Sequence, residues 1–401
     1  MKVYNRFLPL NSPSTIKLVE IISKQGGIAR IVGGAVRDSL IGSKISDVDI
    51  ATNLTPGQVI DLLTKNYIKV IPTGIQYGTV TAIINNQPIE ITTLRKDIKC
   101  FGRKAKVDFT DSFEEDAQRR DFTINALSYC PLDHKIYDYF NGIDDLNSKK
   151  VIFIGIPLER IREDYLRILR FFRFSLRFSK EIDKKGLEAC IEEKEKLSLL
   201  SKERVKSEMD LIFNNMLHMD VVEIMAQSGI LEILYPKTYY NKKLHQEIAS
   251  IAKNYNIASI YLLFYASIFK ESNITNTRQL IDLKFSRQEA IIILELLEFF
   301  SLDSEQLNTR LGQFYIEKRE YEIYFIFAMA ISDQATSIKQ KLLQYQKLIK
   351  KPVFPISGND LMNLGFYGQE IKRNMDYLKT LWIQSDFILS KNQLIKLIQN
   401  D

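Results

Sequence analysis

The chain has 401 residues and a formal net charge of +6, from 55 lysines and arginines against 49 aspartates and glutamates. This length allows a sizeable core and more than one domain, and the positive charge favours a polyanionic partner. Three widely spaced cysteines exclude a zinc knuckle and indicate a reducing compartment, while the most apolar stretch, residues 257–269, is too short to span a membrane. We find no signal peptide and expect a soluble, cytoplasmic protein without membrane contact.

The predicted elements change character near residue 150. Before it, β-rich runs at 78–84 and 87–94 alternate with helical stretches such as 56–65, which is an α/β pattern. After it, helix-period segments dominate to the C-terminus, with a polar break expected near Asn308. A proline-containing interruption at 350–360 is expected to separate a last small helical unit.

The first candidate site combines a glycine turn with paired carboxylates. Gly33 and Gly34 carry no Cβ, so backbone N–H groups can approach phosphate oxygens there, with Arg37 nearby as a cation. Asp47 and Asp49 lie two residues apart on a predicted strand, where alternate side chains share a face and can bind one metal ion. Each piece alone is typical of a plain turn or a solvated strand end, but together they predict a metal and phosphate site.

A third carboxylate is expected on the strand at 87–94. Glu90 alternates with Ile89 and Ile91, so burial of the two isoleucines would turn Glu90 toward a cleft. There it could help to bind a metal or accept the proton of an attacking hydroxyl. The alternative is an exposed strand glutamate without a role.

Charged side chains gather again in RRDFTINAL, residues 119–127. Arg119 and Arg120 can pair with phosphate or ribose oxygens, and Asp121 can bind an arginine or a sugar hydroxyl. The acidic run before this segment suits the first turn of a helix. A surface cluster of salt bridges is the alternative interpretation.

In REDYLRILRFFRF, residues 162–174, we expect a helix with an arginine stripe. Arg167, Arg170 and Arg173 would share one face, with Asp164 one turn before Arg167. Arginines on an otherwise apolar helix are costly unless they meet anionic ligands or paired acids. Either kind of partner would explain the stripe.

The order of these motifs resembles a known family. GGAVRD (33–38), DVDIAT (47–52), RRDFTINAL and REDYLRILRFFRF follow one another as in bacterial class II tRNA nucleotidyltransferases, the CCA-adding enzymes, and their poly(A) polymerase relatives. The resemblance implies a polymerase-beta-like α/β head with a mixed sheet at 1–150, a helical neck at 151–215 that recognises the base, and a helical body and tail at 216–401 that bind tRNA.

The resemblance also implies the chemistry. The expected activity is template-independent addition of C, C and A to the tRNA 3′ end from CTP and ATP, with Mg²⁺ as cofactor and no protein partner. The expected catalytic residues are Asp47, Asp49 and Glu90, of which Asp47 and Asp49 bind the metal. The expected nucleotide-binding residues are Gly33, Gly34, Arg37, Arg119, Arg120, Asp121, Asp164, Arg167, Arg170 and Arg173.

Asp164 and Arg167 offer a chemical basis for choosing the base. Cytosine and adenine present an amine donor beside a ring-nitrogen acceptor, whereas uracil and guanine present a carbonyl acceptor beside a ring N–H. Asp164 can accept from the amine and Arg167 can donate to the ring nitrogen, which would select C and A. Arg170 and Arg173 would contact phosphates or orient this pair. An exposed salt bridge within the helix is the alternative.

Other segments refine the prediction. The basic stretch 94–109 is either a plain solvated loop or the flexible family loop needed to switch from cytosine to adenine. In the segment 201–213, Glu203 and Arg204 are expected to brace the recognition helix. No histidine is followed by aspartate, which argues against a metal phosphohydrolase domain. A poly(A) polymerase, a CC-only or A-only enzyme and a non-catalytic RNA-binding protein stay open as alternatives.

Overall fold

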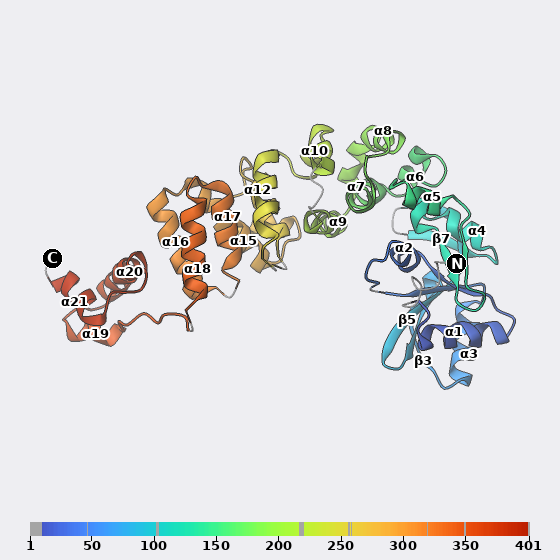
Figure 1. Cartoon of the computed structure of the whole chain (residues 1–401), viewed down its shortest axis with the longest axis horizontal. Coiled ribbons are helices and arrows are strands. Elements are labelled where there is room, and N and C mark those ends of the chain that lie inside the picture. The colour runs from blue at the N-terminus through green and yellow to red at the C-terminus, as the bar shows by residue number, and fades with distance from the viewer. Residues whose placement is uncertain are drawn as a thin grey trace. The chain divides into compact units, whose positions relative to one another are not determined.

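The computed structural model describes residues 10–45, 47–101, 104–215, 220–255, 257, 259–318, 320–348 and 350–399 (Figure 1). They form two compact units. Unit 1 contains the chain up to Glu208 together with Gln227–Leu234, and unit 2 contains Met209–Ala226 and the chain from Tyr235 onward. The boundaries predicted at residues 150 and 215 stay predictions. Among the described residues, every helix is too short or too polar to cross a membrane.

Unit 1 contains a seven-stranded mixed sheet with the strand order β3-β4-β5-β2-β1-β8-β9. Strands β2 and β5 pair in parallel, and the other neighbouring strands pair antiparallel. This is the mixed sheet with helices that was predicted for the N-terminal part. The strands are β1 (Ala29–Val32), β2 (Asp49–Thr52), β3 (Lys69–Gly74), β4 (Thr79–Ile84), β5 (Gln87–Thr93), β8 (Ser128–Cys130) and β9 (Lys135–Tyr137).

Helices make up most of the remaining chain. Several start with a capping box, in which the N-cap side chain and the side chain three residues later each accept from the other's backbone N–H; this holds for α3, α15 and α16. In chain order the helices are α1 (Pro13–Lys24), α2 (Gly34–Leu40), α3 (Pro56–Lys65), η2 (Ile75–Tyr77), α4 (Phe113–Gln118), η3 (Thr123–Asn125), α5 (Gly142–Asn147), α6 (Pro157–Glu163), α7 (Leu166–Phe178), α8 (Lys184–Glu192), η4 (Lys194–Leu199), α9 (Lys202–Asn214), α10 (Asp220–Gln227), α11 (Ile230–Leu234), α12 (Lys242–Ala252), α13 (Tyr261–Ile268), α14 (Thr277–Asp282), α15 (Arg287–Glu298), η5 (Phe299–Ser301), α16 (Ser304–Glu317), α17 (Glu322–Ile331), α18 (Ala335–Gln346), α19 (Gly358–Asn363), α20 (Gln369–Gln384) and α21 (Lys391–Gln399).

The core of unit 1 decides where the carboxylates of the sheet point. Ile50 on β2 and Ile89 and Ile91 on β5 pack in one cluster with helices α1 and α3, which lie side by side at one face of the sheet (Figure 1). Because side chains alternate along a strand, Asp49 and Glu90 point to the opposite face. The two are also direct partners in the parallel ladder. The alternation predicted for Glu90 is therefore present.

Unit 2 is helical and buries its most apolar helices. The stretch predicted as a buried helix contains α13, whose residues Leu262–Ile268 are all buried. In α17 every residue from Ile323 to Ala330 is buried. Beyond residue 357, helices α19 to α21 enclose a cluster around Leu378 and Trp382, with the partly buried Ile316 of α16 packed against it.

Three local expectations are wrong. Residues 94–109 contain an antiparallel hairpin, β6 (Arg95–Phe101) with β7 (Lys104–Phe109), instead of a loop; Arg103, one of its cations, lies outside the described residues. Asn308 lies inside α16, because the capping box at Asp303 starts the helix before it. The helix expected over 162–174 is broken at Asp164, which has extended backbone angles (φ −156°, ψ 107°) between α6 and α7.

Candidate functional site

The glycine turn connects β1 to α2 and lies under an arginine. Gly33 has a left-handed backbone (φ +71°), and its N–H donates to the carbonyl of Leu127 at 3.0 Å. A Cβ at Gly33 would lie 2.8 Å from Nη1 of Arg120, whereas a Cβ at Gly34 would be 3.4 Å from Nη2 of Arg37. Only a residue without a side chain combines this φ with so close an approach. The turn therefore requires glycine at position 33.

The three predicted carboxylates lie near one another on the open side of the sheet. Asp49 is the first residue of β2, Glu90 is its partner on β5, and Asp47 precedes β2; all three are exposed. The pKa of Asp49 is raised, first by partial desolvation and then by the negative charge of Glu90, while Arg120 opposes the rise and Asp47 adds to it. Repulsion of this kind is relieved by a bound cation.

These carboxylates suit a hard divalent cation. In the part of the chain that the structure describes, His, Cys, Asp and Glu side chains do not assemble in a group of three or more around one metal position. A pair of carboxylates is nevertheless a sufficient protein contribution for an ion that also takes water and phosphate oxygens as ligands. Asp47 and Asp49 are the residues that would bind it.

A cavity of about 500 Å³ in unit 1 brings most of the other predicted residues together. It contains every predicted nucleotide-binding residue except Arg173. It adds Asn125, Leu166, Phe174 and Arg204. Asp47, Asp49 and Glu90 do not line it, although the charge of Arg120 reaches Asp49. The lining residues are Gly33, Gly34, Arg37, Arg119, Arg120, Asp121, Asn125, Asp164, Leu166, Arg167, Arg170, Phe174 and Arg204.

One wall of this cavity is a buried hydrogen-bonded chain centred on Asn125. Arg37 Nη1 donates to Asn125 Oδ1, and Asn125 Nδ2 donates to Asp121 Oδ1 at 3.0 Å. Arg170 Nε donates to Asp121 Oδ2 at 2.7 Å. Burial alone would raise the pKa of Asp121, but Arg170 and then Asn125 keep that pKa below its ordinary value. Asn125 was missed as a site residue, although it lies within the RRDFTINAL motif.

Arg170 and Arg173 share a second carboxylate. Glu208 Oε2 is 2.6 Å from Arg173 Nε, and Glu208 Oε1 is 3.6 Å from Arg170 Nη1. Burial lowers the pKa of Arg173, with Glu208 opposing that shift. The stripe expected from the sequence is thus paired with acids, which was one of its two possible explanations. Glu208 was not predicted because it lies 35 residues after Arg173.

Arg119 and Arg120 are held by an acid of the preceding helix. Asp116 Oδ1 is 2.7 Å from Arg119 Nη2, and Asp116 Oδ2 is 3.3 Å from Arg120 Nη2. Burial would raise the pKa of Asp116, but Arg119 and Arg120 lower it below its ordinary value. The acidic run was correctly predicted to start a helix, α4. Its third acid also orients the two arginines, which the sequence interpretation missed.

The backbone N–H of Arg167 donates to the carbonyl of Asp164 at 2.9 Å, but the two side chains have separate partners. Asp164 Oδ2 accepts from Arg204 Nη2 at 2.6 Å, and Asp164 Oδ1 accepts from the N–H of Leu166 at 3.2 Å. The predicted bracing by Arg204 is therefore a direct contact. The helical salt bridge considered as the alternative is absent among the described contacts, because Asp164 is outside the helix that carries Arg167.

Arg167 is oriented by three acceptors. Its Nη1 donates to Glu163 Oε2 at 2.5 Å and to the carbonyl of Arg160 at 2.8 Å, and its Nη2 donates to the carbonyl of Arg119 at 3.1 Å. A guanidinium has five N–H donors, so two of them stay available to a ligand. Glu163 was missed, although it directly precedes Asp164.

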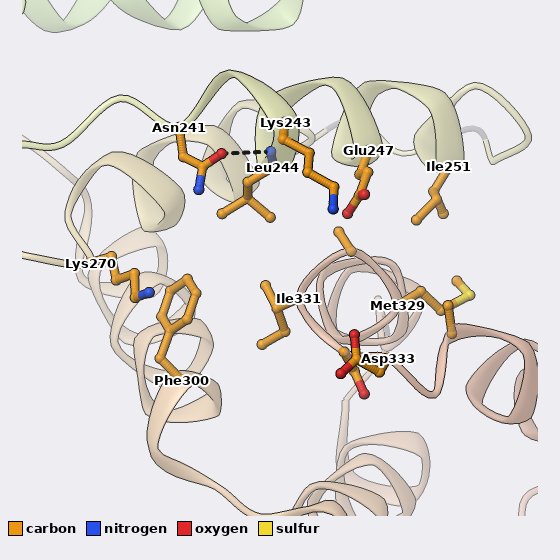
Figure 2. A pocket seen from close by; sticks show the side chains of 13 residues that line it. Asn241, Lys243, Leu244, Glu247, Ile251, Lys270, Phe300, Met329, Ile331 and Asp333 are labelled. Atoms are coloured by element: carbon orange, nitrogen blue, oxygen red, sulfur yellow. Dashed lines mark hydrogen bonds between the residues drawn. The ribbon is translucent and has the colours of Figure 1, made fainter.

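A second hollow of about 500 Å³ lies in unit 2 (Figure 2). Lys243 and Glu247 extend from α12, and the Nζ of Lys270 lies 5.0 Å from the ring centre of Phe300. Its charged lining residues are two lysines and two acids, Glu247 and Asp333. This balance contrasts with the cation-rich cavity of unit 1, which we take as the candidate site.

Comparisons with known proteins agree in family and fold. Residues 29–152 match the model of the Poly A polymerase head domain. The mitochondrial CCA tRNA nucleotidyltransferase 1 of Mus musculus is 32% identical over 404 residues, covering 95% of this chain and 89% of that protein. A CCA-adding enzyme of Lactococcus lactis is 31% identical over 353 residues, covering 86% of each chain.

Two solved structures share the fold at lower identity. The Bacillus stearothermophilus CCA-adding enzyme in complex with CTP has a TM-score of 0.75 and 23% identity, covering 96% of this chain and 97% of that one. The Thermotoga maritima CCA-adding enzyme complexed with tRNA also has a TM-score of 0.75, with 19% identity, covering 100% of this chain and 98% of that one. The predicted fold class, an α/β head followed by helical regions, is confirmed.

Proposed function

The chain belongs to the family of CCA-adding tRNA nucleotidyltransferases, and from that membership we propose that it adds C, C and A to the 3′ end of tRNA, using CTP and ATP and releasing pyrophosphate. One observation carries the proposal. A single cavity joins the glycine turn, the arginines of residues 119–120 and the pair Asp164 and Arg167. Its volume of about 500 Å³ suits one small ligand such as a nucleotide.

The family implies a divalent metal, and we propose Mg²⁺ bound by Asp47 and Asp49. Carboxylate oxygens are the ligands that Mg²⁺ prefers, and the pKa of Asp49 is raised first by partial burial and then by the neighbouring charge of Glu90, both of which a bound cation would offset. When bound, the metal supplies activation of a hydroxyl and neutralisation of the departing pyrophosphate.

The proposed reaction joins the tRNA 3′-oxygen to the α-phosphorus of the nucleotide. The bond from the α-phosphorus to the bridging oxygen of the β-phosphate breaks, and pyrophosphate leaves. Glu90 would accept the hydroxyl proton; it is an exposed carboxylate whose residue pairs with Asp49 in the sheet. Arg120, which lies over the Gly33 turn and acts electrostatically on Asp49, would offset phosphate charge. Arg37 and Arg119 would support the same nucleotide.

Base selection is assigned to Asp164 and Arg167. Arg204 Nη2 lies 2.6 Å from Asp164 Oδ2, and the oxygens of Asp164 have further lone pairs for the amine of cytosine or adenine. Glu163 orients Arg167, whose two remaining N–H donors can reach a ring nitrogen. A wrong base would leave these groups unpaired, at a cost of about 1 to 3 kcal/mol each. Arg170 and Asp121 pair in the wall of the same cavity. Arg173 would orient Arg170 through Glu208, the carboxylate that both arginines contact.

Incubating the full chain with tRNA that lacks CCA tests the function. With CTP and ATP together we expect three additions and then a stop, and with CTP alone two. Continued addition of A would favour the poly(A) polymerase alternative, for which the matched head-domain model is the supporting observation. A stop after two residues in the presence of both nucleotides would indicate a CC-only enzyme. No incorporation would indicate an RNA-binding relative.

The hairpin β6–β7 is proposed to take the role of the family loop that supports the switch from C to A. Its two strands pair from Arg95 opposite Phe109 to Phe101 opposite Lys104. Its presence at full length supports complete CCA addition over CC-only addition. A cytoplasmic location also stays a proposal, supported by the cysteine content of the chain.

The glycine turn gives a matched pair of variants. Gly33→Ala is expected to lower the rate of CTP addition at least about tenfold, because alanine at φ +71° and ψ −131° costs about 1–3 kcal/mol and its Cβ would displace Arg120. Gly34→Ala, with an ordinary helical backbone and a Cβ contact of 3.4 Å, is expected to stay within about threefold of the parent. Single-turnover incorporation measures both; equal effects would contradict this role of Gly33.

A further inference from the structure

A second cation-rich concavity lies in unit 1, outside the nucleotide cavity. It has a volume of about 500 Å³, and its lining includes Lys149, Lys150, Lys180, Lys184 and Lys185, none of which lines the nucleotide cavity. All five side chains are exposed. We propose that this lysine cluster binds backbone phosphates of the same tRNA whose 3′ end enters the active site. The inference rests on the proposed function and adds a second RNA contact to it.

The charge balance of the lysine cluster points to a polyanion. Its lining holds five lysines against two carboxylates, Glu181 and Asp183, a net of +3 where the whole chain has +6. Asp183 Oδ2 already accepts from the N–H of Gly186 at 2.7 Å, as the N-cap of α8. Among the described residues, none of the five lysines takes part in an ion pair. Their ammonium groups are therefore available to an external anion.

Two chain segments, residues 148–152 and 180–185, are held together to form the lysine cluster. The N–H of Lys180, after α7, donates to the carbonyl of Lys149, after α5, at 3.0 Å. Lys184 and Lys185 open α8. Lys149 has a left-handed backbone (φ +52°), a conformation that side chains other than glycine, asparagine and aspartate rarely adopt. The cluster is thus built by tertiary contacts and is not a run of lysines along one surface helix.

Helix α7 connects the lysine cluster to the nucleotide cavity. Its first turns carry Leu166, Arg167 and Arg170, which line the nucleotide cavity, and it ends at Phe178, two residues before Lys180. Eleven residues at about 1.5 Å each place the end of α7 at Phe178 roughly 16 Å from Arg167, and Lys180 follows two residues later. A single tRNA can therefore contact both places.

The hollow of unit 2 offers a comparison within the same chain. It has a similar volume, but its lining holds two lysines and two acids, and one of the lysines, Lys270, lies against the ring of Phe300 (Figure 2). Equal numbers of charges give no preference for phosphate. An excess of cations therefore distinguishes the lysine cluster from a hollow of ordinary surface composition.

The test neutralises part of the lysine cluster and measures binding against salt. The variant Lys150→Gln/Lys180→Gln/Lys184→Gln is compared with Lys24→Gln/Lys65→Gln/Lys69→Gln, which removes the same charge from exposed head positions outside the cluster. The readout is the Kd for tRNA lacking CCA at several salt concentrations. Each lost phosphate contact should lower the slope of log Kd against log salt by about 0.7–0.9.

We expect the cluster variant to lose about two units of this slope and to bind tRNA about tenfold or more weakly at 0.1 M salt. Its kcat at saturating tRNA and its KM for CTP should stay at parent values, and the control variant should keep the parent slope. An unchanged slope in the cluster variant, or an equal loss in the control, would overturn the inference. If the parent protein adds no nucleotide but the slope difference is found, the proposed function fails and the RNA surface stands.

Discussion

Replacing Asp49 with asparagine is expected to reduce CCA addition by about a thousandfold or more, equivalent to about 4 kcal/mol of transition-state stabilisation. The substitution keeps the size of the side chain but removes the charge that would bind the divalent metal together with Asp47. Metal ligation contributes several kcal/mol to such transition states. Single-turnover incorporation of labelled CTP into tRNA lacking CCA measures the loss. Retention of more than a tenth of the parent rate would contradict the assignment.

The same variant should not be less stable than the parent. The pKa of Asp49 is raised in the folded protein, so its ionisation at neutral pH costs folding free energy, and that cost grows as the pH rises through this pKa. Asparagine removes the cost. The melting temperature of Asp49→Asn without metal at pH 7 should therefore equal or exceed that of the parent.

Metal binding can also be measured without activity. Millimolar Mg²⁺ should raise the melting temperature of the parent and leave that of Asp49→Asn nearly unchanged, since a ligand stabilises only a folded state that binds it. Glu90→Gln provides the control. If Glu90 accepts the proton rather than binding the metal, this variant should keep the Mg²⁺ shift and lose activity by about a hundredfold or more.

Exchanging the charges of Asp164 and Arg167 is expected to change which nucleotides are used. In Asp164→Arg/Arg167→Asp the donor and acceptor are reversed, which matches the edges of uracil and guanine. With two groups at about 1–3 kcal/mol each, the preference between base pairs should shift by about 2–6 kcal/mol, or roughly thirtyfold to ten-thousandfold. Competition among the four nucleotides measures this ratio. Continued use of CTP and ATP alone would show that base selection lies elsewhere.

The partners of these two residues change how that experiment should be designed. In the charge-exchanged variant, the new Arg side chain would face Arg204 and the new Asp side chain would face Glu163. We therefore expect a lower melting temperature and a slow enzyme. Adding Arg204→Glu and Glu163→Arg restores both pairs. This fourfold variant should recover stability while keeping the U and G preference, which separates a specificity change from misfolding.

Local sequence patterns were sufficient to predict the alternation of side chains on a strand and the start of a helix. The alternation predicted for Glu90 is present on β5, where Glu90 pairs with Asp49, and the acidic run before Arg119 correctly predicted α4. A helix break was harder to see, because the apolar period continues across Asp164. The sequence did contain one signal for this break, because aspartate often precedes a helix and accepts from a backbone N–H of its first turn. The side chain of Asp164 accepts in this way from the N–H of Leu166 at the start of α7.

Partners far apart in sequence could not be predicted from spacing. Arg204 is 40 residues from Asp164, and Asn125 is 88 residues from Arg37. Only the packing of the folded chain makes them neighbours. The hairpin β6–β7 was missed because charged residues are depleted in strands, so its composition suggested a loop. Domain boundaries also depend on contacts between residues far apart in sequence. The boundaries expected at residues 150 and 215 therefore could not be derived from composition and stay predictions.

The carbonyl oxygen of Arg119 is shared by two arginine side chains, those of Arg167 and Arg160. It accepts from Arg167 Nη2 at 3.1 Å and from Arg160 Nη2 at 2.5 Å, while the side chain of Arg119 belongs to the segment proposed to contact the sugar. On the proposed assignment, one atom is the common reference point for checking the sugar and checking the base. On that assignment, a nucleotide whose sugar displaced this segment would also displace Arg167, so that sugar selection and base selection would be coupled.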